Sequence, residues 1–414
     1  MNSRGSSSRR LPWIAVFSLI LAACSSAGSE TASQDTGSEE APAASAPASE
    51  GQSSADAGDL IGADAWPTFG FEPQRRGIAG EVGAPLDDPE LLWQFQTGGV
   101  VESSPVVVGG TVYVGTFNEQ LFAIDARSGE QRWSFEVGGL VRASPAVVDG
   151  RVFFGADDNL FYAVDADSGE ELWRFELGGG GEQSSPAVVD GVVYFGAFDQ
   201  NVYALDAETG SEIWRFETGA GILSSPLVAN GVVYIGSIDG SFYAIDATTG
   251  DERWEFATGN SIFSSGAWIP ASDGPDGTAA VAFGSDDGRI YAADAETGEE
   301  RWNLQTNGPV FSSPAVADGE VIIGSRDGSF LSISASSGEV LWNTNLTEVL
   351  SSAAVDDNRI YVGSSDGTLH ILDRSGQSLN QLPVGNLVWT SPAVVDGYLF
   401  FGAHDGNIHS YRVS

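Results

Sequence analysis

The chain contains no lysine, so arginine supplies all 18 of its Lys and Arg residues. Acidic residues number 57, and the formal net charge at pH 7 is -39. Beyond the N-terminus the arginines do not cluster, whereas a nucleic-acid-binding surface needs clustered cations to neutralise phosphates. We therefore expect no nucleic-acid partner. The self-repulsion of so acidic a chain favours a soluble monomer.

The chain also contains only one cysteine, Cys24. A single thiol excludes both an internal disulfide framework and a thiolate metal cluster. The three histidines, His370, His404 and His409, do not have the spacing of zinc ligands. No Gly-x-Ser-x-Gly motif or other nucleophile signature is present. These absences predict no catalytic residue and no metal site.

No apolar run is long enough to span a bilayer comfortably; the most apolar stretch is Leu11 to Ala23. Three arginines precede it, and Leu21-Ala-Ala-Cys24 at its end resembles the lipobox of bacterial lipoproteins. The resemblance implies a lipoprotein signal peptide over residues 1–23, cleavage before Cys24 and lipidation of that cysteine. An ordinary signal peptide or a short membrane anchor is the alternative. The export route, general secretory or twin-arginine, stays open.

Large apolar side chains are nearly missing from residues 24–64, which consist mainly of Ser, Ala, Gly, Pro and acid. Such a segment cannot bury enough surface to offset the entropy of ordering it. We expect it to act as a disordered tether between lipidated Cys24 and a folded domain at residues 65–414.

The folded part is built from a repeat. The phrase Ala-x-Asp-x-x-Ser/Thr-Gly-x-x-x-Trp begins at Ala123 and recurs from Ala163, Ala204, Ala244, Ala292 and, with serine in first place, Ser332. Tryptophans return about every 40 residues, at Trp93, Trp133, Trp173, Trp214, Trp254, Trp302 and Trp342. A period of this length indicates repeated supersecondary units, none of which can bury its apolar face alone.

Each unit has the pattern of four antiparallel strands. In one unit Ser144 to Val148 is a short apolar run, and Asp149-Gly150 is a strong signal for a tight hairpin. The second and third strands are expected at Arg151–Ala156 and Leu160–Asp165. Glu171–Glu176 alternates polar and apolar residues, as an outer strand facing water does. Four such strands form one blade of a β-propeller.

Eight blades are predicted, because the Ser-Pro strand recurs at Pro105, Pro145, Pro186, Pro226, Gly266, Pro314, Ala353 and Pro392. The eighth unit ends after three strands, while Leu92–Gln96 is a surplus outer strand before the first unit. We expect this strand to complete the last blade and close the ring. A seven-bladed ring is the alternative, and it would leave one of these halves unpaired.

The repeated phrase resembles the tryptophan-docking motif of the PQQ-like, or quinoprotein-type, eight-bladed propellers. The segment Trp66-Pro-Thr-Phe-Gly-Phe-Glu-Pro-Gln74 resembles the start of those propellers. The resemblance implies that the seven tryptophans pack between blades and that their indole N–H groups reach backbone. The dehydrogenases of this family use an adjacent cysteine pair, calcium, a catalytic aspartate and long insertions.

This chain lacks the cysteine pair and the long insertions. It has one cysteine and one insertion, Ile269–Thr278, whose Asp273 and Asp276 depart from an EF-hand pattern and are better interpreted as part of a surface turn. Pyrroloquinoline quinone (PQQ) and calcium are therefore not expected as cofactors, and we expect no enzyme activity.

The resemblance is closer to the non-catalytic BamB-type lipoproteins, which combine a lipobox, a tether and short blades. It implies a scaffold that binds protein partners in the cell envelope and takes part in outer-membrane β-barrel assembly. The expected location is the periplasmic side of the outer membrane or the cell surface. Two alternatives remain: a PQQ-dependent quinoprotein dehydrogenase, and a binding or sensory propeller at the surface of a cell without an outer membrane.

Partner-binding residues are expected where the repeats differ. The position before each Ser-Ser-Pro is polar in three consecutive blades and large and apolar in five: Glu102, Arg142, Gln183, Leu223, Phe263, Phe311, Leu350 and Trp389. A second variable position lies in the turn between the second and third strands: Phe117, Asp157, Phe198, Ile238, Asp286, Arg326, Ser365 and His404. Both sets belong on one face of a propeller and predict a binding site on loops held by a stiff frame. Alternatively, the apolar residues plug the channel.

The aspartates that follow the second variable position are a further repeated feature. They are Asp158, Asp199, Asp239, Asp287, Asp327, Asp366 and Asp405. A ring of carboxylates could hold metal, but an aspartate at this place in a turn usually caps backbone N–H groups. We expect turn capping.

Overall fold

The computed structural model describes Gly70, Gly77 and residues 88–181 and 184–414. The chain divides into two compact units, Met1–Asp56 and Ala57–Ser414, and all described residues lie in the second. The predicted signal peptide, Cys24, the tether at residues 24–64 and Trp66 lie outside the described residues. No described helix is long and apolar enough to cross a membrane.

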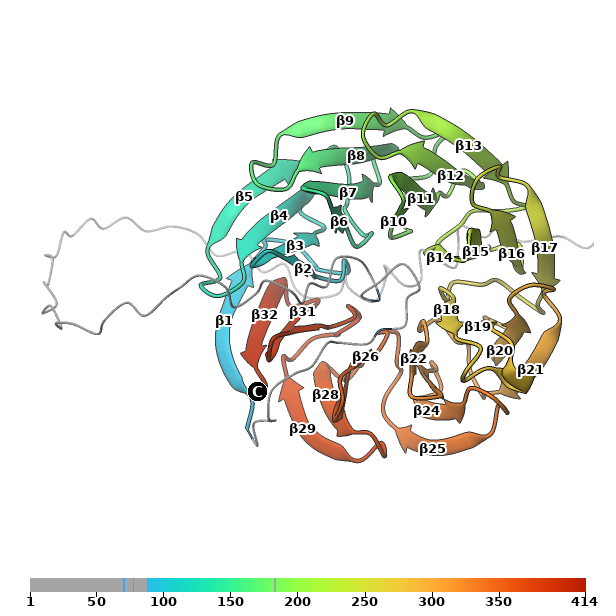
Figure 1. Ribbon diagram of the computed structural model, residues 1–414. Coiled ribbons are helices and arrows are strands. Elements are labelled where there is room, and N and C mark those ends of the chain that lie inside the picture. The colour runs from blue at the N-terminus through green and yellow to red at the C-terminus, as the bar shows by residue number, and fades with distance from the viewer. Residues whose placement is uncertain (1–69, 71–76, 78–87, 182–183) are drawn as a thin grey trace, which may run out of the picture. The chain divides into compact units, whose positions relative to one another are not determined.

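The described part of the chain is an all-β, eight-bladed propeller in which every blade is a four-stranded antiparallel sheet (Figure 1). Blades 1 to 4 consist of β2 (Val106–Val108), β3 (Thr111–Gly115), β4 (Gln120–Asp125) and β5 (Gln131–Glu136); β6 (Ala146–Val148), β7 (Arg151–Ala156), β8 (Leu160–Asp165) and β9 (Glu171–Glu176); β10 (Ala187–Val189), β11 (Val192–Gly196), β12 (Asn201–Asp206) and β13 (Glu212–Glu217); and β14 (Leu227–Ala229), β15 (Val232–Gly236), β16 (Ser241–Asp246) and β17 (Glu252–Ala257).

Blades 5 to 8 continue around the ring. They consist of β18 (Ala267–Ile269), β19 (Ala280–Gly284), β20 (Arg289–Asp294) and β21 (Glu300–Gln305); β22 (Ala315–Ala317), β23 (Glu320–Gly324), β24 (Ser329–Ser334) and β25 (Val340–Asn345); β26 (Ala354–Val355), β27 (Arg359–Gly363), β28 (Thr368–Asp373) and β29 (Ser378–Pro383); and β30 (Ala393–Val395), β31 (Tyr398–Gly402), β32 (Asn407–Arg412) and β1 (Glu90–Gln96). The insertion in blade 5 contains a short 3-10 turn, η1 (Pro275–Gly277).

The strands of blade 2 start and end where the sequence pattern places them, except at the inner strand. The predicted run Ser144–Val148 is a strand only from Ala146, because Pro145 has no N–H and the Ser144 N–H is bonded to the next blade. The hairpin prediction is confirmed, since Asp149 and Gly150 both have positive φ, at 50° and 72°.

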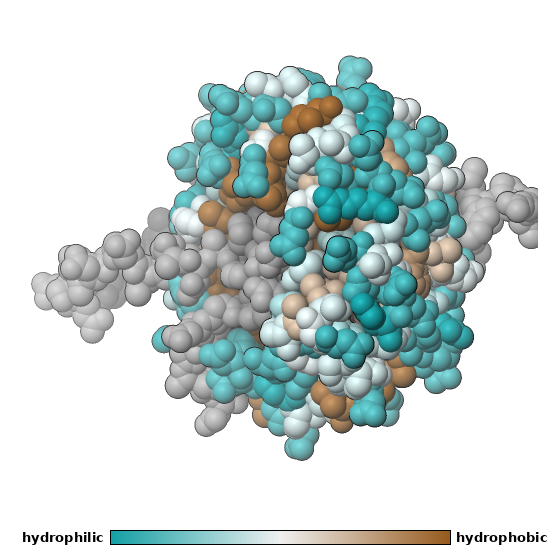
Figure 2. Space-filling view, turned by 45° about the vertical axis from the view of Figure 1, so that its right-hand side comes forward, coloured by the Kyte–Doolittle hydropathy of each residue, from teal (hydrophilic) through white to brown (hydrophobic). Residues whose placement is uncertain are grey.

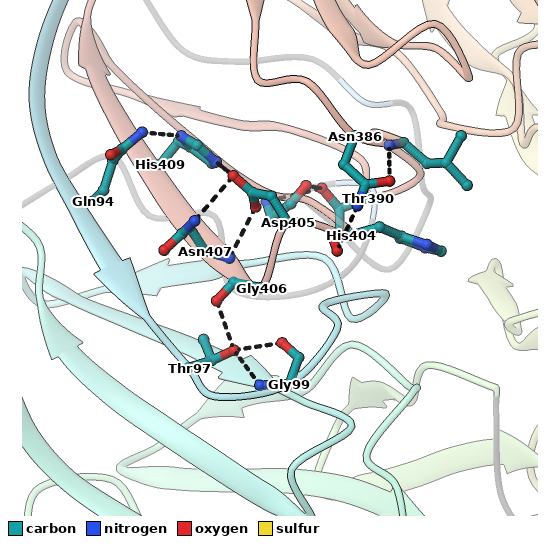
Figure 3. A network of polar contacts seen from close by, with 12 residues as sticks. Gln94, Thr97, Gly99, Asn386, Thr390, His404, Asp405, Gly406, Asn407 and His409 are labelled. Carbon is teal, nitrogen blue, oxygen red and sulfur yellow. Dashed lines mark hydrogen bonds and ion pairs between the residues drawn. The ribbon is translucent and has the colours of Figure 1, made fainter. Parts of the chain in front are cut away.

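The ring is closed by β1, which pairs antiparallel with β32 and so supplies the outer strand of blade 8. Around this junction the Gln94 amide hydrogen-bonds His409 Nδ1 at 3.0 Å, and His409 Nε2 meets Asp405 Oδ2 at 3.0 Å (Figure 3). The Thr97 N–H and hydroxyl both donate to the Gly406 carbonyl oxygen. Side-chain and backbone bonds thus tie the two chain segments together, and the closure leaves no half-blade unpaired.

The apolar core lies between blades, as the cluster joining blades 1 and 2 illustrates. It contains Tyr113 and Leu121 from blade 1 together with Phe154 and Tyr162 from blade 2. Because each sheet buries both faces against its neighbours, a single blade has no core of its own. The face shown in Figure 2 is mainly hydrophilic, with hydrophobic residues in separate patches.

The tryptophans hold consecutive blades together. The Trp133 indole Nε1–H donates to the Ala166 carbonyl oxygen of the next blade at 3.0 Å, and the ring lies against Gly169 of that blade. The same bond is made from Trp93, Trp173, Trp214, Trp254, Trp302 and Trp342. Blade 7 carries Asn380 at this position, so its junction with blade 8 is built differently.

Candidate functional site

Both sets of variable residues lie in neighbouring loops on one face of the ring, which we call the mouth. In every blade the N–H of the second variable residue donates to a backbone carbonyl in the loop that leads into that blade, as Phe117 does to Val100 at 2.9 Å. The other seven bonds start from Asp157, Phe198, Ile238, Asp286, Arg326, Ser365 and His404. The first variable residue of each blade lies in the same loop, so both sets of residues lie on the same face of the ring. Gln183 lies outside the described residues.

One part of the mouth, the polar sector, consists of Glu102, Arg142, Asp157 and His404. Arg142 joins two carboxylates, because its Nε donates to Asp157 Oδ2 at 3.0 Å and its Nη1 to Glu102 Oε2 at 3.2 Å. Its guanidinium also lies 4.4 Å from the centre of the Phe117 ring. Arg142 is half-buried and fixed by three contacts, so the polar sector is preorganised for a partner.

His404 extends the polar sector into blade 8. Its side chain is 7% exposed, and its Nε2 lies 3.5 Å from Glu102 Oε1. Burial lowers the pKa of His404 to about 4, and burial likewise raises the pKa of Glu102 above its ordinary value. His404 Nε2 and Asp157 Oδ1 are buried atoms without a hydrogen-bond partner among the described residues. These two atoms are buried polar groups without a hydrogen bond inside the polar sector.

Five residues of the first variable set form what we call the apolar arc of the mouth: Leu223, Phe263, Phe311, Leu350 and Trp389. All five are partly exposed, and the Phe263 and Phe311 rings meet edge to face at 4.8 Å. The Trp389 ring lies 4.5 Å from that of His404, which joins the arc to the polar sector. Partial exposure leaves apolar surface free at the mouth.

The repeated turn aspartates are engaged within the fold. Asp158 accepts the N–H of Leu160 in its own turn, the N–H of Gly138 in the preceding loop and the hydroxyl of Tyr162. Asp199, Asp239 and Asp287 make the same three kinds of bond. In blades 7 and 8 the tyrosine is replaced by His370 and His409. The carboxylates thus connect neighbouring blades as well as capping turns.

Sequence reasoning missed these tyrosine and histidine partners. The signal that could have found them is an aromatic or histidine residue four positions after the aspartate, at Tyr162, Tyr203, Tyr243, Tyr291, His370 and His409. His370 and His409 therefore belong to the frame of the blades, and of the three histidines only His404 lies at the mouth.

Sequence reasoning also missed a closed serine ring around the channel, formed by Ser104, Ser144, Ser185, Ser225, Ser265, Ser313, Ser352 and Ser391. The backbone N–H of each serine donates to the hydroxyl oxygen of the serine in the next blade at 2.9 to 3.0 Å, and Ser391 returns to Ser104. Every blade has a serine at this position, and this repetition is the sequence signal that could have indicated the ring. The ring fixes the inner ends of the blades behind the mouth.

Carboxylates of the mouth are bonded to other side chains. Among the described residues no group of three His, Cys, Asp or Glu side chains is placed to hold a metal ion. Glu102 and Asp157 are bonded to Arg142, and Asp286 accepts from the Asn260 amide at 3.1 Å. The sequence has a single cysteine, so the adjacent pair that covers the quinone cannot form.

The blades and the docking tryptophans define an eight-bladed β-propeller. Residues 260–414 match the family model described as outer membrane protein assembly factor BamB. Residues 84–276 match a model described as the β-propeller of the beta-alanine-activating enzyme. The resemblance to the PQQ-like and BamB-type propellers is thereby confirmed. No curated protein sequence is significantly similar to the chain.

Solved structures with this fold include enzymes as well as an assembly factor. The quinohemoprotein alcohol dehydrogenase of Comamonas testosteroni has a TM-score of 0.74 at 17% identity, over 84% of this chain and 80% of that one. BamB of Moraxella catarrhalis has a TM-score of 0.66 at 18% identity, over 78% of this chain and 98% of that one. A europium-containing methanol dehydrogenase has a TM-score of 0.72 at 15% identity, over 82% and 89% of the two chains. Identities this low establish the fold alone.

Proposed function

We propose that the protein is a non-catalytic scaffold that binds protein partners at the channel mouth, in a role like that of BamB-type lipoproteins in outer-membrane β-barrel assembly. The observation that carries this proposal is the mouth itself, where the apolar arc adjoins the polar sector on loops of a stiff ring. Partly exposed Phe311, with the Arg326 guanidinium 5.1 Å from its ring centre, and partly exposed Trp389 beside His404 have the composition of a protein-binding hot spot.

The proposal includes export, lipidation of Cys24 and a monomeric propeller tethered to the periplasmic side of the outer membrane. It is supported by the lipobox-like segment before Cys24, by the net charge of -39 and by the match of residues 260–414 to the BamB family model. Replacing Cys24 by serine in the full-length gene would then release the protein from the membrane fraction. Membrane retention of that variant after cleavage of its signal peptide would contradict the lipid anchor.

The partner is tested by affinity capture of the full chain from detergent-solubilised envelope. We expect components of the barrel-assembly machinery to be captured by the wild type and lost from a Trp389→Ala/Phe311→Ala double variant. Leu172→Ala is the matched control, because Leu172 is an exposed apolar residue on β9, an outer strand. Capture without any barrel-assembly component would refute the assembly role. Equal capture by both variants would refute the mouth as the binding site.

A PQQ-dependent dehydrogenase is the second candidate, because enzymes are among the structures with the same fold. Titration with PQQ and calcium, followed by quinone fluorescence, separates the two functions. Tight binding in a 1:1 ratio would overturn the scaffold proposal, and we expect none. A surface-exposed binding or sensory propeller is the third possibility, which localisation in the native envelope decides.

A further inference from the structure

The outer strands of blades 6, 7 and 8 present no charged side chain at their outward-facing positions. On each outer strand these positions are the residue before the tryptophan or its equivalent, the residue after it and the one two further on. In these three blades they are Leu341, Asn343 and Asn345 on β25, Leu379, Gln381 and Pro383 on β29, and Leu92, Gln94 and Gln96 on β1. All nine residues are exposed. We call them the uncharged sector.

The same positions in blades 1 to 4 are heavily charged. They are Arg132, Ser134 and Glu136; Leu172, Arg174 and Glu176; Ile213, Arg215 and Glu217; and Arg253, Glu255 and Ala257. Where an apolar residue is exposed here, an ion pair stands beside it, as Arg174 with Glu171 at 2.8 Å and Arg215 with Glu212 at 2.5 Å. In a chain of net charge -39 the uncharged sector is therefore a local exception.

Charged side chains at these positions protect the edges of the outer strands. Each outer strand is the last strand of its sheet, so one of its edges pairs with no other strand of the described part of the chain. Proteins commonly protect such edges with charged side chains, which prevent another strand from pairing there. Blades 1 to 4 have charged side chains at these positions, whereas β25 and β29 contain none and β1 has only Glu90, at its first residue. Figure 1 shows these three strands as consecutive arcs along one side of the ring.

The uncharged sector also carries exposed aliphatic side chains. Leu341 is 52% exposed, Leu379 is 50% exposed and Leu92 is 36% exposed, and each is followed by amide side chains rather than by ions. An apolar residue beside an open strand edge offers both parts of a strand-binding site. The backbone supplies hydrogen bonds, and the leucines contact alternate side chains of the added strand.

We propose that the uncharged sector is a docking surface for an extended segment of a partner protein, which adds as a β-strand to the edge of β25, β29 or β1. The net charge of this chain indicates which partner segments can bind. The chain as a whole is strongly acidic, so the added strand is apolar, carries no acid and tolerates flanking lysine or arginine. A second copy of this chain is repelled by its own acid. A bilayer is disfavoured, because the three strands contain no basic residue to attract lipid headgroups.

The test uses the full chain and a short capped peptide of alternating valine and threonine with one lysine at each end. Hydrogen exchange of the protein is measured with and without the peptide. We expect slower exchange at amides of β25, β29 or β1 and no change in β9 and β13. A peptide N-methylated at alternate amides keeps its side chains but cannot form the strand ladder, and we expect it to bind about tenfold more weakly or worse.

Variants with added charges test whether the peptide binds at the uncharged sector. Leu341→Glu with Leu379→Glu is expected to weaken peptide binding about tenfold or more, because it places the missing charges beside the edge. Leu172→Glu with Ile213→Glu is the matched control, since these residues are 47% and 49% exposed on β9 and β13 and already stand beside ion pairs. The control is expected to bind like the wild type, as is the mouth variant Trp389→Ala.

Several results would overturn the proposal. They are equal binding by the normal and N-methylated peptides, protection spread over all eight outer strands, and loss of binding in the Leu172→Glu/Ile213→Glu control. Sedimentation velocity and flotation with neutral vesicles complete the test. Self-association or vesicle binding that Leu341→Glu/Leu379→Glu removes, without peptide binding, would assign the surface to a second copy or to lipid instead.

Discussion

Arg359 donates a hydrogen bond from Nη2 to the carbonyl oxygen of Val413 at 2.8 Å, and this bond joins blade 7 to blade 8. Val413 stands where the other blades have the residue whose carbonyl accepts a tryptophan indole, as Ala166 accepts from Trp133. Arg359 is 2% exposed and occupies the first position of β27. The junction that lacks a docking tryptophan therefore keeps its acceptor and takes its donor from a different strand.

Arg359→Met is expected to lower the free energy of unfolding by about 1.5 to 3 kcal/mol, because it removes a charged hydrogen-bond donor from a buried acceptor. Arg151→Met is the control, since Arg151 has the same strand position in blade 2, where Trp173 already bonds Ala207 of the next blade. Urea unfolding followed by tryptophan fluorescence measures both. Equal losses in the two variants would show that the Val413 bond has no special role.

Gly210→Ala is expected to destabilise the protein by about 1 to 3 kcal/mol more than Gly191→Ala does. Both glycines have positive φ, at 70° and 76°, so the backbone strain is matched. A Cβ on Gly210 would lie 2.6 Å from the Trp173 ring, whereas one on Gly191 would meet nothing within 4 Å. The difference between their unfolding midpoints isolates the indole contact between blades 2 and 3. Indistinguishable midpoints would mean that the ring moves aside at no cost.

Ser265→Ala is expected to cost about 1 to 3 kcal/mol, because it leaves the buried Ser225 N–H without an acceptor and opens the serine ring. Ser134→Ala on the exposed face of β5 is the control, with an expected change within about 0.5 kcal/mol. Thermal unfolding of the two variants gives the comparison. A loss no larger than that of Ser134→Ala would make the ring a consequence of blade packing instead of a contributor to stability.

Stability is expected to fall as the pH drops from 6.5 toward 4, in part because of His404. Burial lowers the pKa of this histidine from 6.5 to about 4, so between these values the unfolded chain binds a proton that the folded chain does not. His404→Gln, which carries no titrating group, should flatten the dependence of the unfolding free energy on pH in this window. The raised pKa of Glu102 acts with the opposite sign and reduces the slope of the wild type.

Below this pH range the pH dependence of stability comes mainly from carboxylates. The pKa values of Asp125 and Asp294 are lowered from 3.8 to about 2, since arginine side chains and backbone N–H groups hold these side chains in their ionised form against the opposing effect of burial. Stability that is present above pH 3.8 is lost as the pH falls through 2. His404→Gln should therefore change the slope of the unfolding free energy against pH only above the pH range in which Asp125 and Asp294 titrate. An unchanged slope between pH 6.5 and 4 would contradict the assignment to His404.

The repeat made the fold predictable from sequence. Trp133 and its equivalents at about 40-residue spacing, with Asp149-Gly150 and similar hairpin signals, determine four strands per blade and the number of blades, since period and turn chemistry are local properties. The surplus strand at Leu92–Gln96 pointed to the closing partner of the last blade, and the observed β1 begins two residues earlier, at Glu90. These features need no knowledge of what lies on the neighbouring blade.

What the sequence left undecided are the contacts between residues far apart along the chain. The alignment of variable positions marked Glu102, Arg142 and His404 as candidates, yet only the closed ring brings His404 to 3.5 Å from Glu102. The same holds for the partner of Arg359, the serine ring and the uncharged sector. Period and turns are written in each 40-residue unit, whereas a junction depends on which side chains two blades present to each other, and that is decided only when the ring closes.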